Sequence, residues 1–127
     1  MKRYFRFLGG IATGALAVSA LSQVAPDEDP INISPELYAV RFENDRVRVL
    51  EYRNPPGGIE AMHSHPPGVV IYLGDSSSRT TLPDGSSSVG SRKQGDVVWR
   101  DRTRHASENI GVTEVHAIAI ELKSPTR

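Results

Sequence analysis

Apolar and polar residues alternate with a period of two in the first part of the chain beyond about residue 35. Such alternation appears over residues 38–43, an Asn-Asp pair follows at 44–45, and residues 46–53 form a second extended run. A period of two places neighbouring side chains on opposite faces of a β-strand, so the two runs predict a hairpin. The apolar positions of the second run change parity, which predicts either a strand covered on both faces or a bulge near Leu50.

Short extended runs continue to the end of the chain, separated by turns that contain Gly and Pro. We expect strands over residues 59–65, 69–73, 79–82, 86–90, 96–100, 105–108 and 114–122. No window of about ten or more residues beyond residue 20 has the 3.6-residue period of a helix. Short strands at this spacing predict an all-β fold with antiparallel sheets, either a sandwich or a barrel.

The first twenty residues have the pattern of a secretory signal peptide. Basic residues at positions 2, 3 and 6 precede an uncharged run of 14 mostly apolar or small residues at 7–20, which ends in Val18-Ser19-Ala20. Small residues at its end are typical of a cleavage site, and the run is shorter than the roughly 20 residues that span a bilayer. We therefore expect a signal peptide at 1–20, a flexible lead-in at 21–34 and one folded domain at 35–127. The mature protein is expected to be periplasmic or secreted, without a stable membrane span.

Composition narrows the chemistry that this domain can perform. The chain has 127 residues, of which 38% are hydrophobic and 24% charged, as in an ordinary globular domain. It has no cysteine, so His, Asp and Glu are its strong metal ligands. Cleavage would remove three of the 15 basic and none of the 15 acidic residues, which leaves a net charge of −3. Because no basic stripe is present, we do not expect nucleic acid as a partner.

His63 and His65 are one residue apart in the strand expected over 59–65. Alternate residues of a strand share a face, so their imidazoles are expected to project together. A transition metal takes three or more such ligands, and His105 is the best candidate for the third. Three imidazoles suit one divalent ion of Fe, Zn, Mn, Ni or Cu and leave positions open for water or substrate. The alternative is a group of histidines that only form hydrogen bonds near a barrel mouth.

His116 is a candidate fourth ligand in the strand expected over 114–122. A histidine that packs beside Ile118 and forms an ordinary hydrogen bond is the alternative that we favour. Glu51 and Glu60 are further carboxylates near the predicted site. We expect neither to be a ligand, because Glu60 has the opposite parity from the two histidines of its strand.

Residues around the loop before His105 are candidates for substrate binding. Guanidinium groups bind carboxylates and phosphates through paired hydrogen bonds, and aromatic rings line ligand pockets. The candidates are Arg100, Arg102, Arg104, Tyr72 and Trp99. The alternatives are a solvated loop with a local Arg-Asp pair, and aromatic residues that lie in the core or in a dimer interface.

These motifs, in this order, resemble those of a small single-domain cupin of the RmlC-like superfamily. The first cupin motif matches at Gly57, His63, His65 and Gly74, and the second matches at Gly95, His105 and Asn109. The likeness covers roughly residues 38–122 and is greatest to a subgroup that shares the HSHP sequence at 63–66, the GDVVW sequence at 95–99 and the ENIG sequence at 108–111.

The resemblance implies a double-stranded β-helix, an antiparallel jelly-roll barrel with a metal inside, and a homodimer. The glutamate ligand of the first motif is absent, since Val69 and Val70 occupy its expected positions. The resemblance leaves two hypotheses open. One is a metal-dependent enzyme, of dioxygenase or isomerase type, that acts on a small anionic metabolite. The alternative is a non-catalytic module that binds a metal or a small ligand. A proton-transfer group beside the metal would distinguish the two hypotheses.

Overall fold

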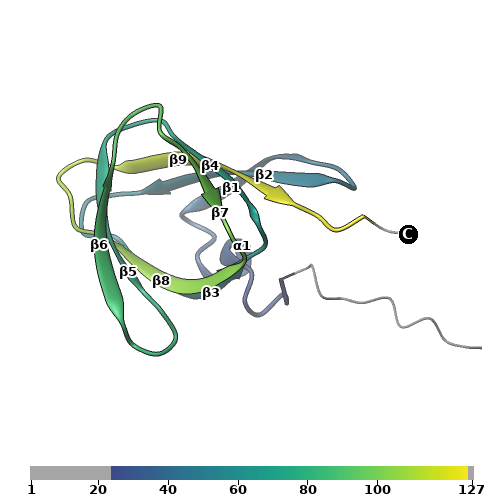
Figure 1. Cartoon of the computed structure of the whole chain (residues 1–127), viewed down its shortest axis with the longest axis horizontal. Helices are drawn as coiled ribbons and strands as arrows, with labels where there is room; N and C mark the ends of the chain where they lie inside the picture. The colour runs from purple at the N-terminus through teal and green to yellow at the C-terminus, as the bar shows by residue number, and fades with distance from the viewer. Residues whose placement is uncertain (1–23, 126–127) are drawn as a thin grey trace, which may run out of the picture.

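The computed structural model describes residues 24–125, where the chain forms nine strands and one short helix (Figure 1). In chain order these are α1 Pro30–Ile33, β1 Tyr38–Glu43, β2 Val47–Asn54, β3 Ile59–His65, β4 Gly68–Tyr72, β5 Ser76–Thr81, β6 Ser87–Arg92, β7 Val97–Arg100, β8 Thr103–Asn109 and β9 Val115–Leu122. The predicted signal peptide at 1–20 lies outside the described residues. Among the described residues, no helix has the length and apolar character needed to cross a membrane.

The strands form two antiparallel sheets that curve around a common interior (Figure 1). One sheet has the order β1-β2-β9-β4-β7, and the other has the order β3-β8-β5-β6. Apart from the consecutive pairs β1–β2 and β5–β6, neighbouring strands come from distant parts of the chain, as when β9 lies between β2 and β4. The predicted all-β fold with antiparallel sheets in a jelly-roll arrangement is confirmed.

The predicted first hairpin is present as β1 and β2. Its turn is held by Asn44, whose Oδ1 accepts hydrogen bonds from the backbone N–H groups of Arg46 at 2.8 Å and Val47 at 2.9 Å. The irregularity expected near Leu50 lies in the partner strand: the β1–β2 register shifts between Val40 and Phe42. β2 itself pairs with β9 without a break.

A second register shift lies in β3, between Glu60 and His63. Glu60 pairs with Ser107 and His63 pairs with His105, so three steps along β3 oppose two steps along β8. One extra residue in a strand is a β-bulge, and it moves the residues on one side of it to the other face. Glu60 and His63 therefore both face the interior, although they are three residues apart.

The interior of the barrel is only partly apolar. Its apolar cluster consists of Leu50, Val70, Ala117 and Ala119, with Ile31, Tyr38 and Tyr72 packed against it. Fully buried polar side chains occupy the rest, namely His63, His65, Glu60, Glu121, Asn54 and Asn109. Burial of a polar group costs free energy unless it is hydrogen-bonded, so such a concentration of polar groups indicates a functional site more than a core built for stability.

The lead-in is ordered where the structure describes it, over residues 24–34. Asp29 caps α1 by accepting a hydrogen bond from Ile31 N–H at 3.1 Å, and the same carboxylate accepts from Arg48 of β2 at 2.7 Å. Pro30 is buried, and the Glu28 carboxylate accepts from the Ser64 hydroxyl at 2.8 Å. These contacts attach the described part of the expected lead-in to the barrel.

Candidate metal centre

Three histidines converge inside the barrel, two from β3 and one from β8. His63 pairs directly with His105 across the two strands, and His65 follows on the same face of β3. One ring nitrogen of each histidine lies within 4.8 Å of those of the other two. His63 and His65 are fully buried, and His105 is partly buried. The structure thus brings together the three residues that the sequence singled out.

The outer nitrogens of the two β3 histidines are held by hydrogen-bond acceptors. His63 Nδ1 lies 2.7 Å from the carbonyl oxygen of Ala61, within the bulge, and His65 Nδ1 lies 2.8 Å from Glu121 Oε1. A carbonyl or carboxylate oxygen accepts but does not donate, so each Nδ1 carries the hydrogen. In the neutral imidazoles each Nε2 then bears a lone pair.

The two Nε2 atoms face one another at 2.8 Å. Two lone pairs at that separation repel unless a cation lies between them, either a proton or a metal ion. A proton on His65 is disfavoured, because burial, helped by Arg100, His63 and Arg48, lowers the pKa of His65 well below its ordinary value. Burial, together with the other two histidines and Arg100, lowers the pKa of His105 to about 3. Neutral imidazoles are the form that binds metals.

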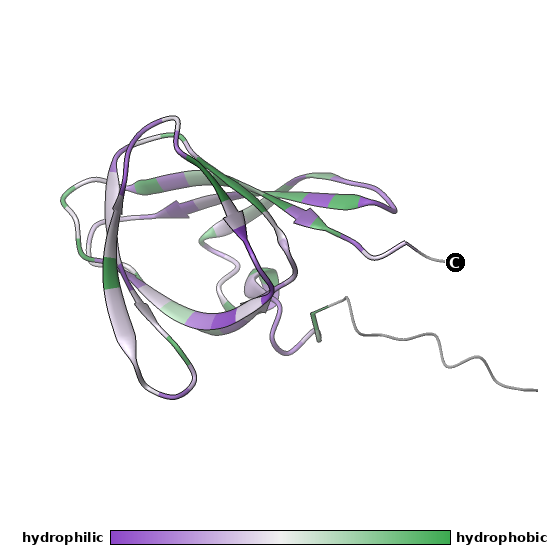
Figure 2. Cartoon of the chain, viewed as in Figure 1, coloured by the Kyte–Doolittle hydropathy of each residue, from purple (hydrophilic) through white to green (hydrophobic). Residues whose placement is uncertain are grey.

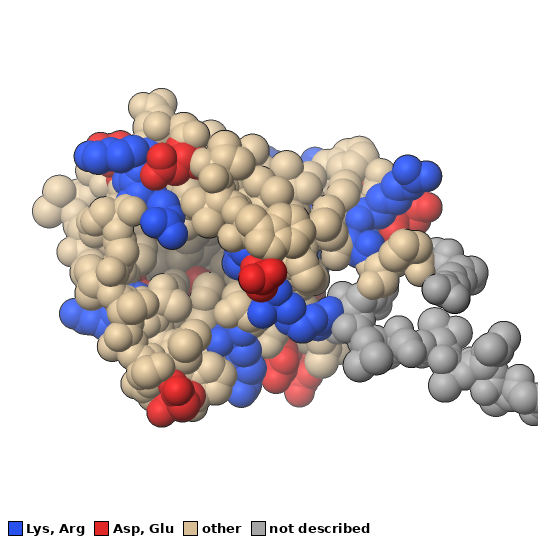
Figure 3. Space-filling view, in the orientation of Figure 1, with Lys and Arg blue, Asp and Glu red and all other residues tan. Residues whose placement is uncertain are grey.

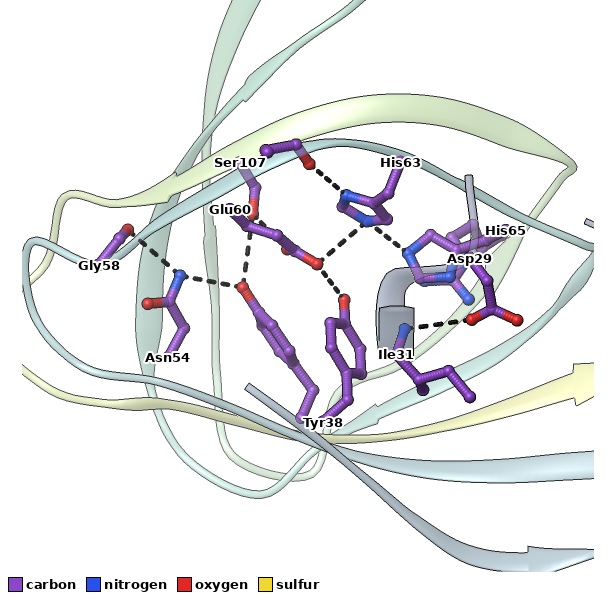
Figure 4. Close-up of polar contacts among 12 residues, drawn as sticks. Asp29, Ile31, Tyr38, Asn54, Gly58, Glu60, His63, His65 and Ser107 are labelled. Carbon is purple, nitrogen blue, oxygen red and sulfur yellow. Dashed lines mark hydrogen bonds and ion pairs between the residues drawn. The ribbon is translucent and has the colours of Figure 1, made fainter. Parts of the chain in front are cut away.

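Glu60 is the functional residue that sequence reasoning missed. Its Oε1 lies 3.2 Å from His63 Nε2 and accepts a hydrogen bond from the Tyr38 hydroxyl, while Oε2 accepts from the Ser107 hydroxyl at 2.9 Å (Figure 4). Burial and the neighbouring Glu60 raise the pKa of Tyr38, so Tyr38 acts as a donor. Strict alternation along β3 would place Glu60 on the face opposite to His63 and His65. The bulge between Glu60 and His63 places it on the same, interior face.

Glu121 is the other buried carboxylate of the site. Besides His65, it pairs with Arg48 at 2.7 Å and lies 3.6 Å from Arg100. Arg48 in turn pairs with Asp29 of the lead-in at 2.7 Å. This chain of alternating charges fixes the orientation of the His65 ring, in the way that a carboxylate behind a ligating histidine does in metalloproteins.

His116, the candidate fourth ligand, does not lie with the three clustered histidines. Residues 115, 117, 119 and 121 of β9 face the interior and are buried. His116 therefore projects from the outer face, where its Nε2 lies 2.8 Å from Glu51 Oε1. The favoured alternative, a packed and hydrogen-bonded histidine, describes its position. Val70 faces inward in the apolar cluster and supplies no carboxylate there.

A cavity of about 310 Å³ opens beside the histidines. Figure 3 shows the molecule hollowed on this face, with basic side chains at the edge of the hollow. Among its lining residues are Tyr72 and Trp99, as expected, together with Arg92 and Arg100. Trp99 is half exposed, and its indole N–H donates to Asp101 at 2.8 Å.

Arg100 is the more buried of the two arginines that line the cavity. Its Nε and Nη2 are buried without a hydrogen-bond partner among the described residues, and burial lowers its pKa despite the nearby Glu121. Buried donors are almost always satisfied, so these two are available to an acceptor that enters the cavity.

Arg102 and Arg104, two of the candidate substrate-binding residues, lie outside the barrel and away from the cavity. They line a surface depression together with residues of the lead-in, and Arg104 pairs with Glu28 at 3.2 Å. The alternation of strand β8 explains the difference, because His105 points inward and its neighbour Arg104 points outward.

The free energy of unfolding of the metal-free protein is expected to fall as the pH drops below about 6.5, the pKa of a free imidazole. The unfolded chain then binds protons at His65 and His105 that the folded protein does not bind. The contribution of the neutral histidines to the free energy of unfolding is fully present above about pH 6.5. It decreases as the pH falls from there to about 3, the pKa of His105 in the folded protein. Each histidine contributes up to about 1.4 kcal/mol per pH unit.

Urea unfolding of chelator-treated protein at about pH 7, 6 and 5 measures this dependence. The His105→Gln variant is the control and should have a shallower pH dependence, because one of the two histidines is gone. A free energy of unfolding that stays constant over this range would contradict the prediction.

The proteins to which this chain is similar are found among solved structures. No family model matches the sequence, and no curated protein matches it. Among solved structures, the chain is similar to a cupin domain from Bordetella pertussis Tohama I, with 30% sequence identity and a TM-score of 0.63 over 68% of this chain and 92% of that chain.

Two more distant structures share the fold. One is a protein with a double-stranded β-helix domain from Klebsiella pneumoniae, at 18% identity and a TM-score of 0.53 over 68% of this chain and 83% of that one. The other is an RmlC-like cupin family protein from Methanocaldococcus jannaschii, at 16% identity and a TM-score of 0.53 over 68% of this chain and 80% of that one.

Proposed function

This chain belongs to the cupin family, whose members share the double-stranded β-helix fold, and on that premise we propose that it binds one divalent transition metal through His63, His65 and His105. The observation that carries the proposal is the pair of Nε2 atoms that face one another at 2.8 Å while both Nδ1 atoms donate elsewhere. A metal ion between such lone pairs turns a repulsive arrangement into a stable one.

The donor set fits a metal of the Fe, Zn, Mn, Ni or Cu group. Two ligands that each lie about 2.1 Å from one ion, at a right angle, are roughly 3 Å apart. The separation of the His63 and His65 nitrogens, 2.8 Å, is close to that value. When bound, such an ion supplies Lewis acidity or, if it is iron, oxygen activation.

Glu60 favours an enzyme over a passive binding module. A general base must lie within hydrogen-bond reach of the reacting groups, and Glu60, which lines the cavity, has its carboxylate 3.2 Å from His63 Nε2, the nitrogen that we propose as a metal ligand. Tyr38 and Ser107 orient the carboxylate by donating to both of its oxygens. We assign Glu60 the transfer of a proton to or from the bound substrate.

The proposed substrate is a small anionic metabolite. Arg100 supports this assignment, because two of its buried nitrogens have no hydrogen-bond partner within residues 24–125 and a carboxylate would accept from both. The volume of the cavity, about 310 Å³, suits a small molecule. The N-terminal pattern of residues 1–20 supports the further proposal that the protein works in the periplasm or outside the cell.

Elemental analysis of the purified protein tests whether it binds a metal. Turnover is tested by NMR after the metal-loaded protein has been incubated with a panel of small carboxylates. We expect near-stoichiometric metal, and turnover that is lost in Glu60→Gln while carboxylate binding is kept. Binding without turnover in the unaltered protein would support the non-catalytic module instead. Absence of metal even after reconstitution would overturn the metal site.

A further inference from the structure

Two arginines line the cavity, Arg100 at the end of β7 and Arg92 at the end of β6. Arg100 takes part in the function proposed above, whereas Arg92 has no role in it. Arg92 is exposed and Arg100 is more buried, so the two side chains differ in depth. A ligand that enters this cavity therefore passes one positive charge near the surface and reaches a second further inside.

The register of β6 places the Arg92 side chain on the cavity side of its sheet. Arg92 lies directly opposite Ser76 of β5, which is buried. Ser78, two residues further along β5, lines the cavity. Residues directly opposite in an antiparallel pair share a face, as do alternate residues of one strand. Arg92 therefore shares the cavity face with these two serines.

Tyr72 of β4 supports the Arg92 side chain. The guanidinium carbon of Arg92 lies 5.7 Å from the centre of the Tyr72 ring, which also lines the cavity. A cation over an aromatic face is attracted to the ring, and the contact leaves the guanidinium N–H groups available. Within residues 24–125, the Arg92 side chain donates to the backbone oxygen of Ser91 at 3.2 Å and pairs with no carboxylate. The ring thus holds a guanidinium that has no acidic partner among these residues.

The two arginines come from different levels along the cavity. In the pair of β4 with β7, Arg100 lies opposite Gly68. Tyr72, which contacts Arg92, lies four residues further along β4, a distance of about 13 Å in a strand. A ligand that contacts both arginines is therefore expected to be elongated, with one end near each.

The wall between these two levels is apolar. Val70 and Val98 pair directly across β4 and β7, and both line the cavity. Their pair lies two residues from the pair of Gly68 with Arg100, and two residues from Tyr72. Figure 2 shows hydrophobic bands along the strands of this sheet. Transfer of methylene groups from water to such a wall is favourable.

The charges that face the cavity are mainly positive. Glu60 is the one carboxylate among the residues of 24–125 that line it, and its oxygens accept hydrogen bonds from Tyr38 and Ser107. Burial lowers the pKa values of the two lining histidines, His65 and His105, and keeps them neutral. Two arginines against one carboxylate leave an excess of positive charge, which an anionic ligand balances.

We propose that the ligand of this cavity is an aliphatic dicarboxylate, with one carboxylate bound by Arg100 and the other by Arg92. The proposal rests on the function proposed above, in which Arg100 binds a carboxylate, and it makes Arg92 a residue that determines specificity. A monocarboxylate bound at Arg100 leaves Arg92 in contact with solvent, whereas a dicarboxylate of the right length adds a second charge-assisted hydrogen bond. Arg92 therefore selects the ligand by its second acidic group.

Calorimetric titration of the metal-loaded protein with linear dicarboxylates from malonate to pimelate tests this proposal. The monoamide of each dicarboxylate is the matched ligand, because it has the same length and one negative charge fewer. We expect one chain length to bind about 10-fold more tightly than its monoamide, since it makes one more charge-assisted hydrogen bond. The emission of Trp99, the single tryptophan of the chain, gives a second readout because Trp99 lines the cavity.

Arg92→Met should remove the preference for the dicarboxylate and leave the affinity for the monoamide unchanged. Lys93→Met is the matched control, because Lys93 is the next positive charge along the chain, pairs with Asp75 at 3.1 Å and does not line the cavity. This variant should keep the preference. Because two carboxylates can also chelate a metal ion, the titration is repeated on chelator-treated protein, where the preference that depends on Arg92 should remain.

Equal affinity for each dicarboxylate and its monoamide would overturn the proposal. So would an equal loss of preference in Lys93→Met, or a preference that Arg92→Met leaves intact. In each of these cases carboxylate binding at Arg100 stands, and the function proposed above stands with it. If the unaltered protein binds neither kind of ligand, carboxylates are not its substrates and both proposals fall.

Discussion

Replacement of His63 by alanine is expected to reduce metal affinity by more than the roughly 10–100-fold that the loss of an outer-shell partner costs. His63 lies between His65 and Glu60, at 2.8 Å and 3.2 Å respectively, and pairs with His105 on the next strand. Its removal takes away a direct donor and opens the centre to water. Calorimetric titration with zinc or iron(II), after chelation, measures the change.

His116→Ala is the matched control for this experiment. It removes the same side chain from the same protein, but on the outer face, where His116 contacts Glu51 at 2.8 Å. Metal affinity should be unchanged in this variant, and His105→Ala should behave like His63→Ala. If His116→Ala lost metal as well, or if His63→Ala retained full affinity, the assignment of the centre would be wrong.

Arg100→Met is expected to weaken carboxylate binding without lowering the free energy of unfolding. Methionine has a similar length but no charge, so an entering carboxylate loses one or two charge-assisted hydrogen bonds, which corresponds to roughly a 10–100-fold loss of affinity. The folded protein no longer buries a guanidinium with unpartnered nitrogens at Nε and Nη2. Its free energy of unfolding should therefore stay equal or rise, because the guanidinium is no longer desolvated while Glu121 keeps its closer partner Arg48 at 2.7 Å.

Acetate and malonate are suitable probes, and urea unfolding of the ligand-free protein gives the stability. Arg104→Met is the control, because Arg104 lies on the outside beside Glu28 and should affect neither measurement strongly. A loss of stability by several kcal/mol in Arg100→Met would mean that Arg100 serves the fold through Glu121. Unchanged carboxylate affinity would remove it from the binding site.

The sequence alone predicts the general fold and half of the site. A period of two is a local property of a strand, so the hairpin of β1 and β2 and the shared face of His63 and His65 follow from residue spacing. Turn residues likewise act locally, as Asn44 does between these strands. The order of the strands in the two sheets does not follow in this way, because pairing between distant segments depends on the whole fold.

The tertiary structure decides which side chains complete the site, and the reason is register. A single extra residue in β3 brings Glu60 to His63, against its parity in the sequence. The packing of the two sheets around one interior brings Glu121 of β9 to His65 of β3. The orientation of β9 in its sheet turns His116 outward, away from the centre that its residue type suggested. Spacing along the chain determined which residues alternate, and only packing between strands determined which face is the interior.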